Sequence, residues 1–327
     1  MIGNWDASGA LTTKPAKTGT VLPATCSTGE AFFNIAATGG QNFYLCKPDN
    51  TWTQVSTGGS SPTLKALVFD GSTAVSGETM SAWSCGSGSG ATCTTQWTVP
   101  SGVTWVRVQA WSGGSGGQGS SGGDRGGQGG GGGGWDEVIC GVTPGNAYVV
   151  TVGLGGSGGT NGYGVGAGVG GNSGFGNCFS VVGASGANEG YLNGLGNKYP
   201  GDWELISMCT GVGTDAYSYA NRVDQGGCGG GCNVSSGQRG FLAGSTAMGG
   251  GGGGGGAFNS DTYAPGGTSV YGGAGGHGGA WTSGTGLTAC TAGSIPGGGG
   301  GGAGVATSGN KTGCAGARGE VRIYYIH

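Results

Sequence analysis

Long glycine blocks are the feature that most restricts the folds open to this chain. It holds 90 glycines in 327 residues, and most of them lie in blocks beyond residue 112. Glycine costs a helix about 1 kcal/mol per position relative to alanine, so ordinary helical and doubly wound α/β folds are excluded for most of the chain. Collagen is excluded too, because no run keeps glycine at every third position with proline between.

The composition around the glycine argues against disorder. Charged residues make up only 8% of the chain and the net charge is −3, whereas disordered chains combine low hydrophobicity with high charge. The alternative of a flexible linker is disfavoured, because a linker rarely fills about 150 residues with Trp and Cys throughout. The near-neutral charge, without a Lys/Arg cluster, also argues against nucleic-acid and anionic-membrane partners.

Strand patterns bracket the glycine. Alternation in the segment around 103–110 indicates a half-buried strand. One face holds Val103, Trp105, Arg107 and Gln109, and the face expected to meet the core holds Thr104, Val106, Val108 and Ala110. Two further strands are predicted at 135–142 and 146–154, joined by a turn at Thr143–Asn146.

These patterns predict an all-β fold, in which β-sandwich strands bracket a bundle of polyglycine-II helices. Such a helix has three residues per turn and no internal hydrogen bonds. Neighbouring glycine segments can therefore pair N–H with C=O groups laterally, which satisfies backbone groups that are buried. Four tryptophans at the strand-to-glycine borders are expected to cover the ends of the bundle: Trp97, Trp105, Trp111 and Trp135.

Composition divides the chain into five segments. Residues 1–20 are polar and irregular, an N-terminal arm. Residues 21–56 read as a small Cys-bearing β-hairpin module, and 57–63 as a linker. A β-strand region covers 64–112, and the glycine-rich bundle covers 113–327. An insert of ordinary composition at 177–225 interrupts the bundle, and a strand at 319–326 closes it.

The 11 cysteines indicate an oxidising final environment. The first 25 residues lack the apolar core of a secretory signal, and no stretch reaches the ~18 apolar residues of a membrane span. A virion-surface protein, made in the cytoplasm and later exposed, would satisfy both facts; a mature form whose signal was removed is the alternative. Spacing suggests the local disulfides Cys26–Cys46, Cys85–Cys93 and Cys290–Cys314, although connectivity cannot be read from sequence. An odd count leaves at least one thiol free or intermolecular.

Catalytic and metal motifs are weak, and we expect no enzyme, no metal and no cofactor. The only histidines are His277 and His327, and neither lies in a motif typical of a triad. Cys228 and Cys232 have no second Cys or His pair nearby, as a zinc site would need. Acids of the insert could pair for glycoside hydrolysis, yet such acids in a polar loop are usually solvated: Glu189, Asp202, Glu204, Asp215 and Asp224.

The order of elements from about residue 97 onward carries a family resemblance. VPSGVTWVRVQAW leads into glycine, EVICGVTPGNAYVVTVGLGG follows, and GEVRIYYI ends the chain. This order resembles the glycine-rich domain of bacteriophage tail-fibre and adhesin proteins. The resemblance implies a rigid polyglycine-II bundle whose distal loops bind a receptor on the host cell. The high cysteine count and the insert at 177–225 depart from the family pattern.

Aromatic residues in the insert and in nearby loops are the candidates for receptor binding. Tyr and Trp give large contact area at low entropy cost, and loops on a rigid scaffold are the usual place for recognition. The alternative is that these side chains form a small core of their own. The candidates are Tyr191, Tyr199, Trp203, Tyr217, Tyr219, Arg222, Phe258, Tyr263, Tyr271 and Trp281.

We therefore expect a structural and adhesive virion protein, such as a phage tail fibre, spike or tail-tip adhesin. Its expected partners are other virion or tail proteins through the N-terminal region, and a host surface protein or glycan. Assembly into a homo-oligomer such as a trimer stays open, and no membrane insertion is expected. One alternative is a secreted, self-assembling extracellular or ice-binding glycine-rich protein. A second is a surface-polysaccharide depolymerase.

Overall fold

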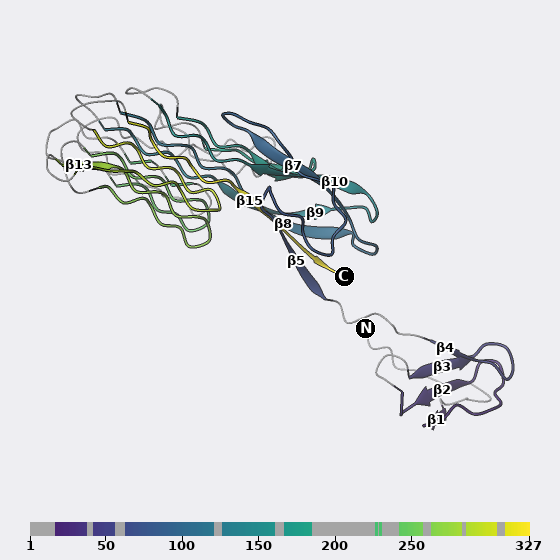
Figure 1. Cartoon of the computed structure of the whole chain (residues 1–327). Coiled ribbons are helices and arrows are strands. Elements are labelled where there is room, and N and C mark those ends of the chain that lie inside the picture. Colours follow the sequence, from purple (N-terminus) through teal and green to yellow (C-terminus); the bar gives the residue numbers. More distant parts are fainter. Residues whose placement is uncertain are drawn as a thin grey trace. The chain divides into compact units, whose positions relative to one another are not determined.

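The computed structural model describes residues 17–37, 42–55, 63–120, 126–160, 167–184, 226–227, 229–230, 242–257, 263–282, 286–305 and 311–327. Throughout these residues the secondary structure is strand, turn or extended backbone, without a helix (Figure 1). The prediction of an all-β fold is therefore confirmed. The chain divides into two compact units, residues 1–63 and 64–327.

The first unit is a four-stranded sheet in the order β1-β2-β3-β4. Its strands are β1 (Lys17–Gly19), β2 (Ala31–Asn34), β3 (Phe43–Cys46) and β4 (Trp52–Gln54). The parallel strand β1 lies in the segment expected to be an irregular arm. A disulfide joins Cys26 to Cys46, and the ring of the buried Phe32 packs 5.7 Å from that of Trp52. A unit this small buries little apolar surface, so the disulfide supplies stability that its core cannot.

The second unit contains a β-sandwich of two antiparallel sheets, built from strands at both ends of the unit's sequence. One sheet has the order β5-β15-β8-β9, and the other has the order β12-β11-β10-β7-β6. Their inner faces enclose one core, which includes Phe69, Trp97, Val108, Phe175 and Ile323. The strands are β5 (Leu64–Phe69), β6 (Ser84–Cys85), β7 (Thr92–Thr98), β8 (Trp105–Trp111), β9 (Trp135–Gly141), β10 (Ala147–Gly153), β11 (Ser173–Phe175), β12 (Phe179–Val181) and β15 (Glu320–Ile326). A further hairpin, β13 (Ala280–Thr282) with β14 (Gly286–Thr288), lies apart from both sheets (Figure 1).

The face assignment for β8 holds where the residues are in the strand. Val106, Val108 and Ala110 are buried, and Trp105 is exposed. At Val103 and Thr104 the assignment is wrong, because Val103 is buried and Thr104 is exposed. The strand starts only at Trp105, so the two preceding residues lie between a turn and the strand and do not follow the period of two.

The turn at Thr143–Asn146 moves the chain from one sheet to the other. Although β9 and β10 are consecutive, β9 pairs with β8 and β10 pairs with β7. A disulfide ties the two sheets together close by, between Cys140 of β9 and Cys178 in the turn before β12. Connections that cross between sheets are the usual way in which a sandwich closes over its core.

The tryptophan expectation is partly wrong. Trp111 and Trp135 do lie where β8 and β9 meet the glycine, with ring centroids 6.3 Å apart, and Trp111 Nε1 donates to the carbonyl of Met248. Trp97 is instead fully buried in the sandwich core. Trp105 lies at the end of β8 that is away from the glycine block, because the other six residues of the strand, 106–111, come between them.

The glycine-rich segments run side by side and are bonded through their backbones (Figure 1). In segment 112–120, successive backbone N–H groups donate hydrogen bonds to three neighbouring segments in turn, and the order repeats every three residues. Gly113 and Gly116 donate to carbonyls 171 and 168, Gly114 and Gly117 to 317 and 314, and Ser115 and Gln118 to 131 and 128. A helix with three residues per turn and no internal hydrogen bonds produces this rotation. The segments therefore pack as polyglycine-II helices.

Segment 296–305 is bonded to six other segments, the number that surrounds a rod in hexagonal packing. These are 112–120, 126–134, 249–257, 272–280, 290–295 and 311–319. A Cβ built on Gly300 would lie 2.0 Å from the carbonyl oxygen of Cys314, so no side chain fits there. The backbone groups of this segment are satisfied by neighbouring segments, as buried N–H and C=O groups require.

Side chains return at the surface of the bundle with the period of the helix. In the sequence GGAGGHGGA of segment 272–280, every third residue is not glycine. Ala274 is exposed and His277 is half-buried, whereas Ala280, at the end of the segment, is buried. Within the lattice, short hydroxyls replace some backbone acceptors, since the N–H groups of Gly134 and Gly131 donate to Oγ of Ser112 and Ser115.

The described residues contain the disulfides Cys26–Cys46, Cys85–Cys93, Cys140–Cys178 and Cys290–Cys314. Three of them are the pairs that local spacing suggests. Cys140 and Cys178 are 38 residues apart and carried no local signal. Such a set of disulfides indicates an oxidising, extracellular environment.

Removing the inter-sheet disulfide should destabilise the second unit. Replacing both Cys140 and Cys178 with serine frees a loop of 38 residues in the unfolded chain. The gain in entropy of the unfolded chain should lower the free energy of unfolding by roughly 2–5 kcal/mol. The matched control replaces Cys85 and Cys93, which close only eight residues between paired strands. We expect the larger fall in melting temperature for the first pair, and equal falls would contradict the role assigned to it.

Candidate binding surfaces

Most of the predicted receptor residues lie outside the part of the chain that the structure describes. Seven lie outside the described residues: Tyr191, Tyr199, Trp203, Tyr217, Tyr219, Arg222 and Phe258. Trp281 is described through its backbone only, as the middle residue of β13. Tyr263 and Tyr271 remain, and both side chains are exposed.

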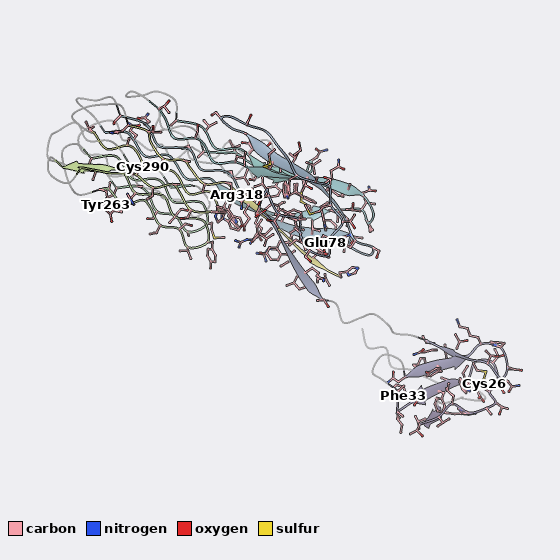
Figure 2. All side chains as sticks on the ribbon, viewed as in Figure 1. Cys26, Phe33, Glu78, Tyr263, Cys290 and Arg318 are labelled. Atoms are coloured by element: carbon pink, nitrogen blue, oxygen red, sulfur yellow. A yellow bond between two sulfur atoms is a disulfide. The ribbon has the colours of Figure 1, made fainter. Side chains whose placement is uncertain are left out.

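The structure does not bring Tyr263 and Tyr271 together. Tyr263 packs against the ring of His277, with centroids 4.4 Å apart, near the end of the bundle where β13 lies (Figure 2). Tyr271 donates its backbone N–H to Ala247, which adjoins Met248, the residue that accepts the indole N–H of Trp111. Tyr271 is therefore at the sandwich end, and the two tyrosines cannot share one contact surface.

His277 is a structural residue of the bundle surface. Its Nδ1 lies 2.9 Å from the carbonyl oxygen of Gly278, and its backbone N–H donates to Oγ1 of Thr291. No group of three or more His, Cys, Asp or Glu that could hold a metal occurs in the part of the chain that the structure describes. In the same part, no helix is long and apolar enough to span a membrane.

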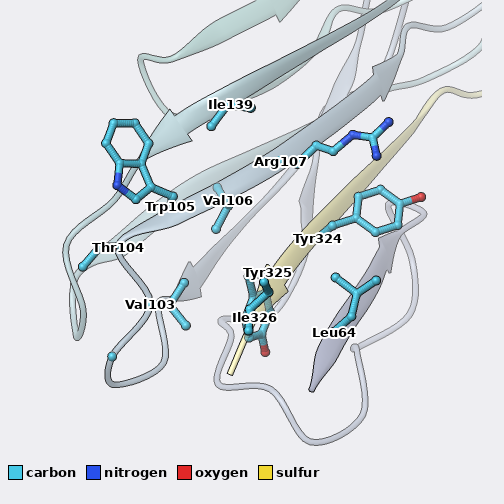
Figure 3. A pocket seen from close by; sticks show the side chains of 11 residues that line it. Leu64, Val103, Thr104, Trp105, Val106, Arg107, Ile139, Tyr324, Tyr325 and Ile326 are labelled. Atoms are coloured by element: carbon cyan, nitrogen blue, oxygen red, sulfur yellow. The ribbon is translucent and has the colours of Figure 1, made fainter. Parts of the chain in front are cut away.

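A second surface lies on the outer face of the sheet β5-β15-β8-β9, at the start of β8. Large apolar side chains are exposed there: Leu64 (68%), Trp105 (64%), Ile139 (67%) and Ile326 (64%). Together with Arg107 and Tyr324 they line an open cavity of about 400 Å³ (Figure 3). We call this group of six residues the Trp105 surface. Contiguous exposed apolar surface of this kind marks a binding site more often than single exposed residues do.

Trp105 is held by the backbone of the neighbouring strand. It lies opposite Gly141 in the pairing of β8 with β9. A Cβ built on Gly141 would meet ring atoms of the indole at 3.4–3.8 Å, so the ring rests over the glycine. A tryptophan that covers a cross-strand glycine stabilises the sheet. This contact leaves the rest of the indole exposed.

Polar side chains continue the same sheet face beside Trp105. Arg107 donates to Glu137 at 2.7 Å, Gln109 donates to the same carboxylate at 2.7 Å, and the Tyr324 hydroxyl bonds to Gln109 at 3.2 Å. The guanidinium of Arg107 also lies 5.7 Å from the centroid of the Tyr324 ring. The side chains therefore hold one another in fixed orientations.

The ion pair of Arg107 and Glu137 stays charged over a wide pH range. The hydrogen bond from Arg107 lowers the pKa of Glu137, and the bond to Glu137 raises the pKa of the Arg107 guanidinium. Opposite charges in contact favour both charged forms. The Trp105 surface thus carries one positive group that is neutralised at close range.

The sequence pattern places Trp105 correctly outside the core. A large aromatic residue on the polar face of an alternating strand is a signal of a binding surface, but the expectation that Trp105 covers the end of the bundle overlooks it. The partners of Trp105 come from β5, β9 and β15, and their positions depend on strand order, which the sequence does not reveal.

Comparison with known families gives one result. Residues 88–326 match a family model described as a glycine-rich domain. The match begins just before β7 and ends with the last residue of β15, so it includes most of the sandwich and the whole bundle. No match was found among curated proteins.

Proposed function

We propose that this chain, which belongs to the glycine-rich domain family, is a structural and adhesive protein of a virion. In this proposal it is a phage tail fibre, spike or tail-tip adhesin that contacts a receptor on the host cell. The polyglycine bundle acts as a rigid support, and recognition lies in the segments where side chains return.

The observation that carries the proposal is the bonding of the bundle interior. Segment 296–305 is bonded to six neighbours through backbone groups, and a Cβ at any of residues 298–302 would collide with the backbone of a neighbouring segment. An interior built so largely of glycine offers few side chains for chemistry, but it can hold loops in fixed positions. Binding residues are found disproportionately on loops that a rigid scaffold supports.

Two further features support the proposal. The disulfides suit a protein that works outside the cell. The first unit, residues 1–63, is compact by itself, which suits attachment to other virion or tail proteins. The receptor in this proposal is a host surface protein or glycan, bound by the insert at 177–225 or by exposed aromatic residues elsewhere.

The proposal is tested by adsorption. Purified chain at micromolar concentration should block adsorption of the phage that encodes it to host cells, and gold-labelled antibodies against the chain should mark the tail. Unlabelled particles would contradict the proposal, as would filaments formed by the chain alone, which favour the self-assembling alternative. Release of reducing ends from host polysaccharide would instead establish a depolymerase.

A further inference from the structure

Exposure of the indole is the first step toward a ligand for the Trp105 surface. The ring rests over Gly141, yet about two-thirds of the residue is open to solvent. The flat face of an aromatic ring is hydrophobic and carries a partial negative charge. The C–H face of a sugar ring is flat, apolar and slightly positive, so it is a ligand surface that matches.

Polar groups that could bind sugar hydroxyls lie at a fixed distance from the indole of Trp105. Trp105 and Arg107 are two residues apart on one face of β8, which places them about 7 Å apart along the strand. Arg107, Glu137 and Gln109 are already joined by hydrogen bonds at 2.7 Å. The guanidinium has five N–H donors and the carboxylate several acceptor positions, so the pair can also bond adjacent hydroxyl groups. Because their orientations are set beforehand, little entropy is lost on binding.

Charge and size select among ligands. Arg107 and Glu137 neutralise one another at 2.7 Å, so the site offers no net charge to attract an anion. Its cavity of about 400 Å³ falls in the ordinary range for small-ligand sites, about 300–1,000 Å³. Protein–protein interfaces are enriched in Trp, Tyr and Arg but depleted of Glu, whereas here the carboxylate of Glu137 lies against Arg107 on the same sheet face as Trp105.

We propose that the cavity at the Trp105 surface binds one ring of a neutral saccharide. The indole of Trp105 supports the C–H face of the ring, and Arg107 with Glu137 bonds its hydroxyl groups. Ile139 and Ile326, on the strands to either side of β8, contact the apolar parts of the ring and its substituents. This inference rests on the proposed function, because a saccharide on the host surface would then be a receptor bound by the sandwich rather than by the insert.

The test uses the full chain on an array of neutral and acidic oligosaccharides. We expect binding to at least one neutral oligosaccharide, and at least a tenfold loss of affinity for Trp105→Ala, in line with the cost of removing a central aromatic contact. Trp105→Phe should lose less, because a ring remains. Phe33→Ala, which removes an exposed aromatic side chain of the first unit, is the matched control and should bind like the wild type. Thermal melting of each variant checks that it folds.

A second measurement reads the site directly. Titration of the bound oligosaccharide into 15N-labelled chain should shift the indole N–H resonance that is missing from Trp105→Phe. The inference would be overturned if the chain bound no oligosaccharide on the array, if it bound acidic sugars only, or if Trp105→Ala bound with unchanged affinity. Dimerisation that depends on Trp105 would do the same, because a second copy would then occupy the site. If Trp105→Ala blocks phage adsorption as well as the wild type does, the saccharide site is wrong and the proposed function stands.

Discussion

Replacing Gly253 with alanine should lower the stability of the second unit by at least about 3 kcal/mol, at the upper end of the effect of overpacking a close-packed interior. A Cβ on Gly253 would lie 2.0 Å from the carbonyl oxygen of Gly300. The atoms that the Cβ would meet all belong to the backbone of Gly300 and Gly301, so the strain cannot be relieved by rotating a side chain. For a unit of this size the fall in melting temperature should be roughly 6–12 °C.

The matched control for this prediction is Gly86→Ala. The nearest atom to a Cβ on Gly86 is 3.7 Å away, an ordinary contact. This change should alter stability by less than about 1 kcal/mol, and a gain is reasonable because alanine restricts the unfolded chain. Equal melting temperatures for Gly253→Ala and Gly86→Ala would contradict the close packing of the bundle.

Replacing Glu78 with alanine should cost about 2–5 kcal/mol, because it removes the acceptor of two buried donors. Trp97 Nε1 donates to one carboxylate oxygen of Glu78 at 2.9 Å, and the Tyr325 hydroxyl donates to the other at 2.8 Å. Trp97 and Tyr325 are both buried in the core, on different sheets. Glu78 therefore ties the loop before β6 to both sheets.

Variants of Glu78 separate the hydrogen bonds from the packing. Glu78→Gln keeps one acceptor oxygen and should lose less stability than Glu78→Ala. Ser76→Ala, at an exposed position of the same loop, should have little effect. The measurement is chemical denaturation of each variant, and a loss below about 0.5 kcal/mol for Glu78→Ala would show that the two donors are satisfied otherwise.

The same contact predicts a loss of stability in alkali. Burial, and then the bond to Glu78, raise the pKa of Tyr325 well above its ordinary value of 10.0. A group whose pKa is raised by folding contributes stability below its unfolded pKa, and this contribution is lost as pH rises above that value. Stability of the wild type should fall as pH rises above about 10, and Tyr325→Phe should show a weaker fall. An unchanged alkaline profile in Tyr325→Phe would contradict this assignment.

Much of the sandwich could be predicted from local patterns. Val106 and Val108 follow a strand period of two, and the turn chemistry of Pro144 and Gly145 lies where β9 gives way to β10. Strand order was not predictable in the same way. The chain crosses between sheets at this turn, and only long-range contacts, such as the Cys140–Cys178 disulfide, record it.

The sequence predicts some features of the bundle and not others. Because glycine carries no side chain, the sequence does not predict which segments are neighbours. It does indicate how deeply a segment is buried, through the spacing of its non-glycine residues. The uninterrupted glycine of 297–302 belongs to the segment with six neighbours, and the interrupted GGAGGHGGA of 272–280 lies where side chains reach solvent. A period of three residues per turn makes this distinction readable.

Amide hydrogen exchange tests the central claim, that the glycine segments form a rigid hydrogen-bonded lattice. Exchange should be slowest at amides that donate to neighbouring segments, such as those of Gly130, Gly276 and Gly300. These amides should exchange as slowly as those of the sandwich core, because both require global opening. Uniformly fast exchange across 126–134, 249–257 and 296–305 would contradict the account, since it would show that the glycine behaves as a solvated linker.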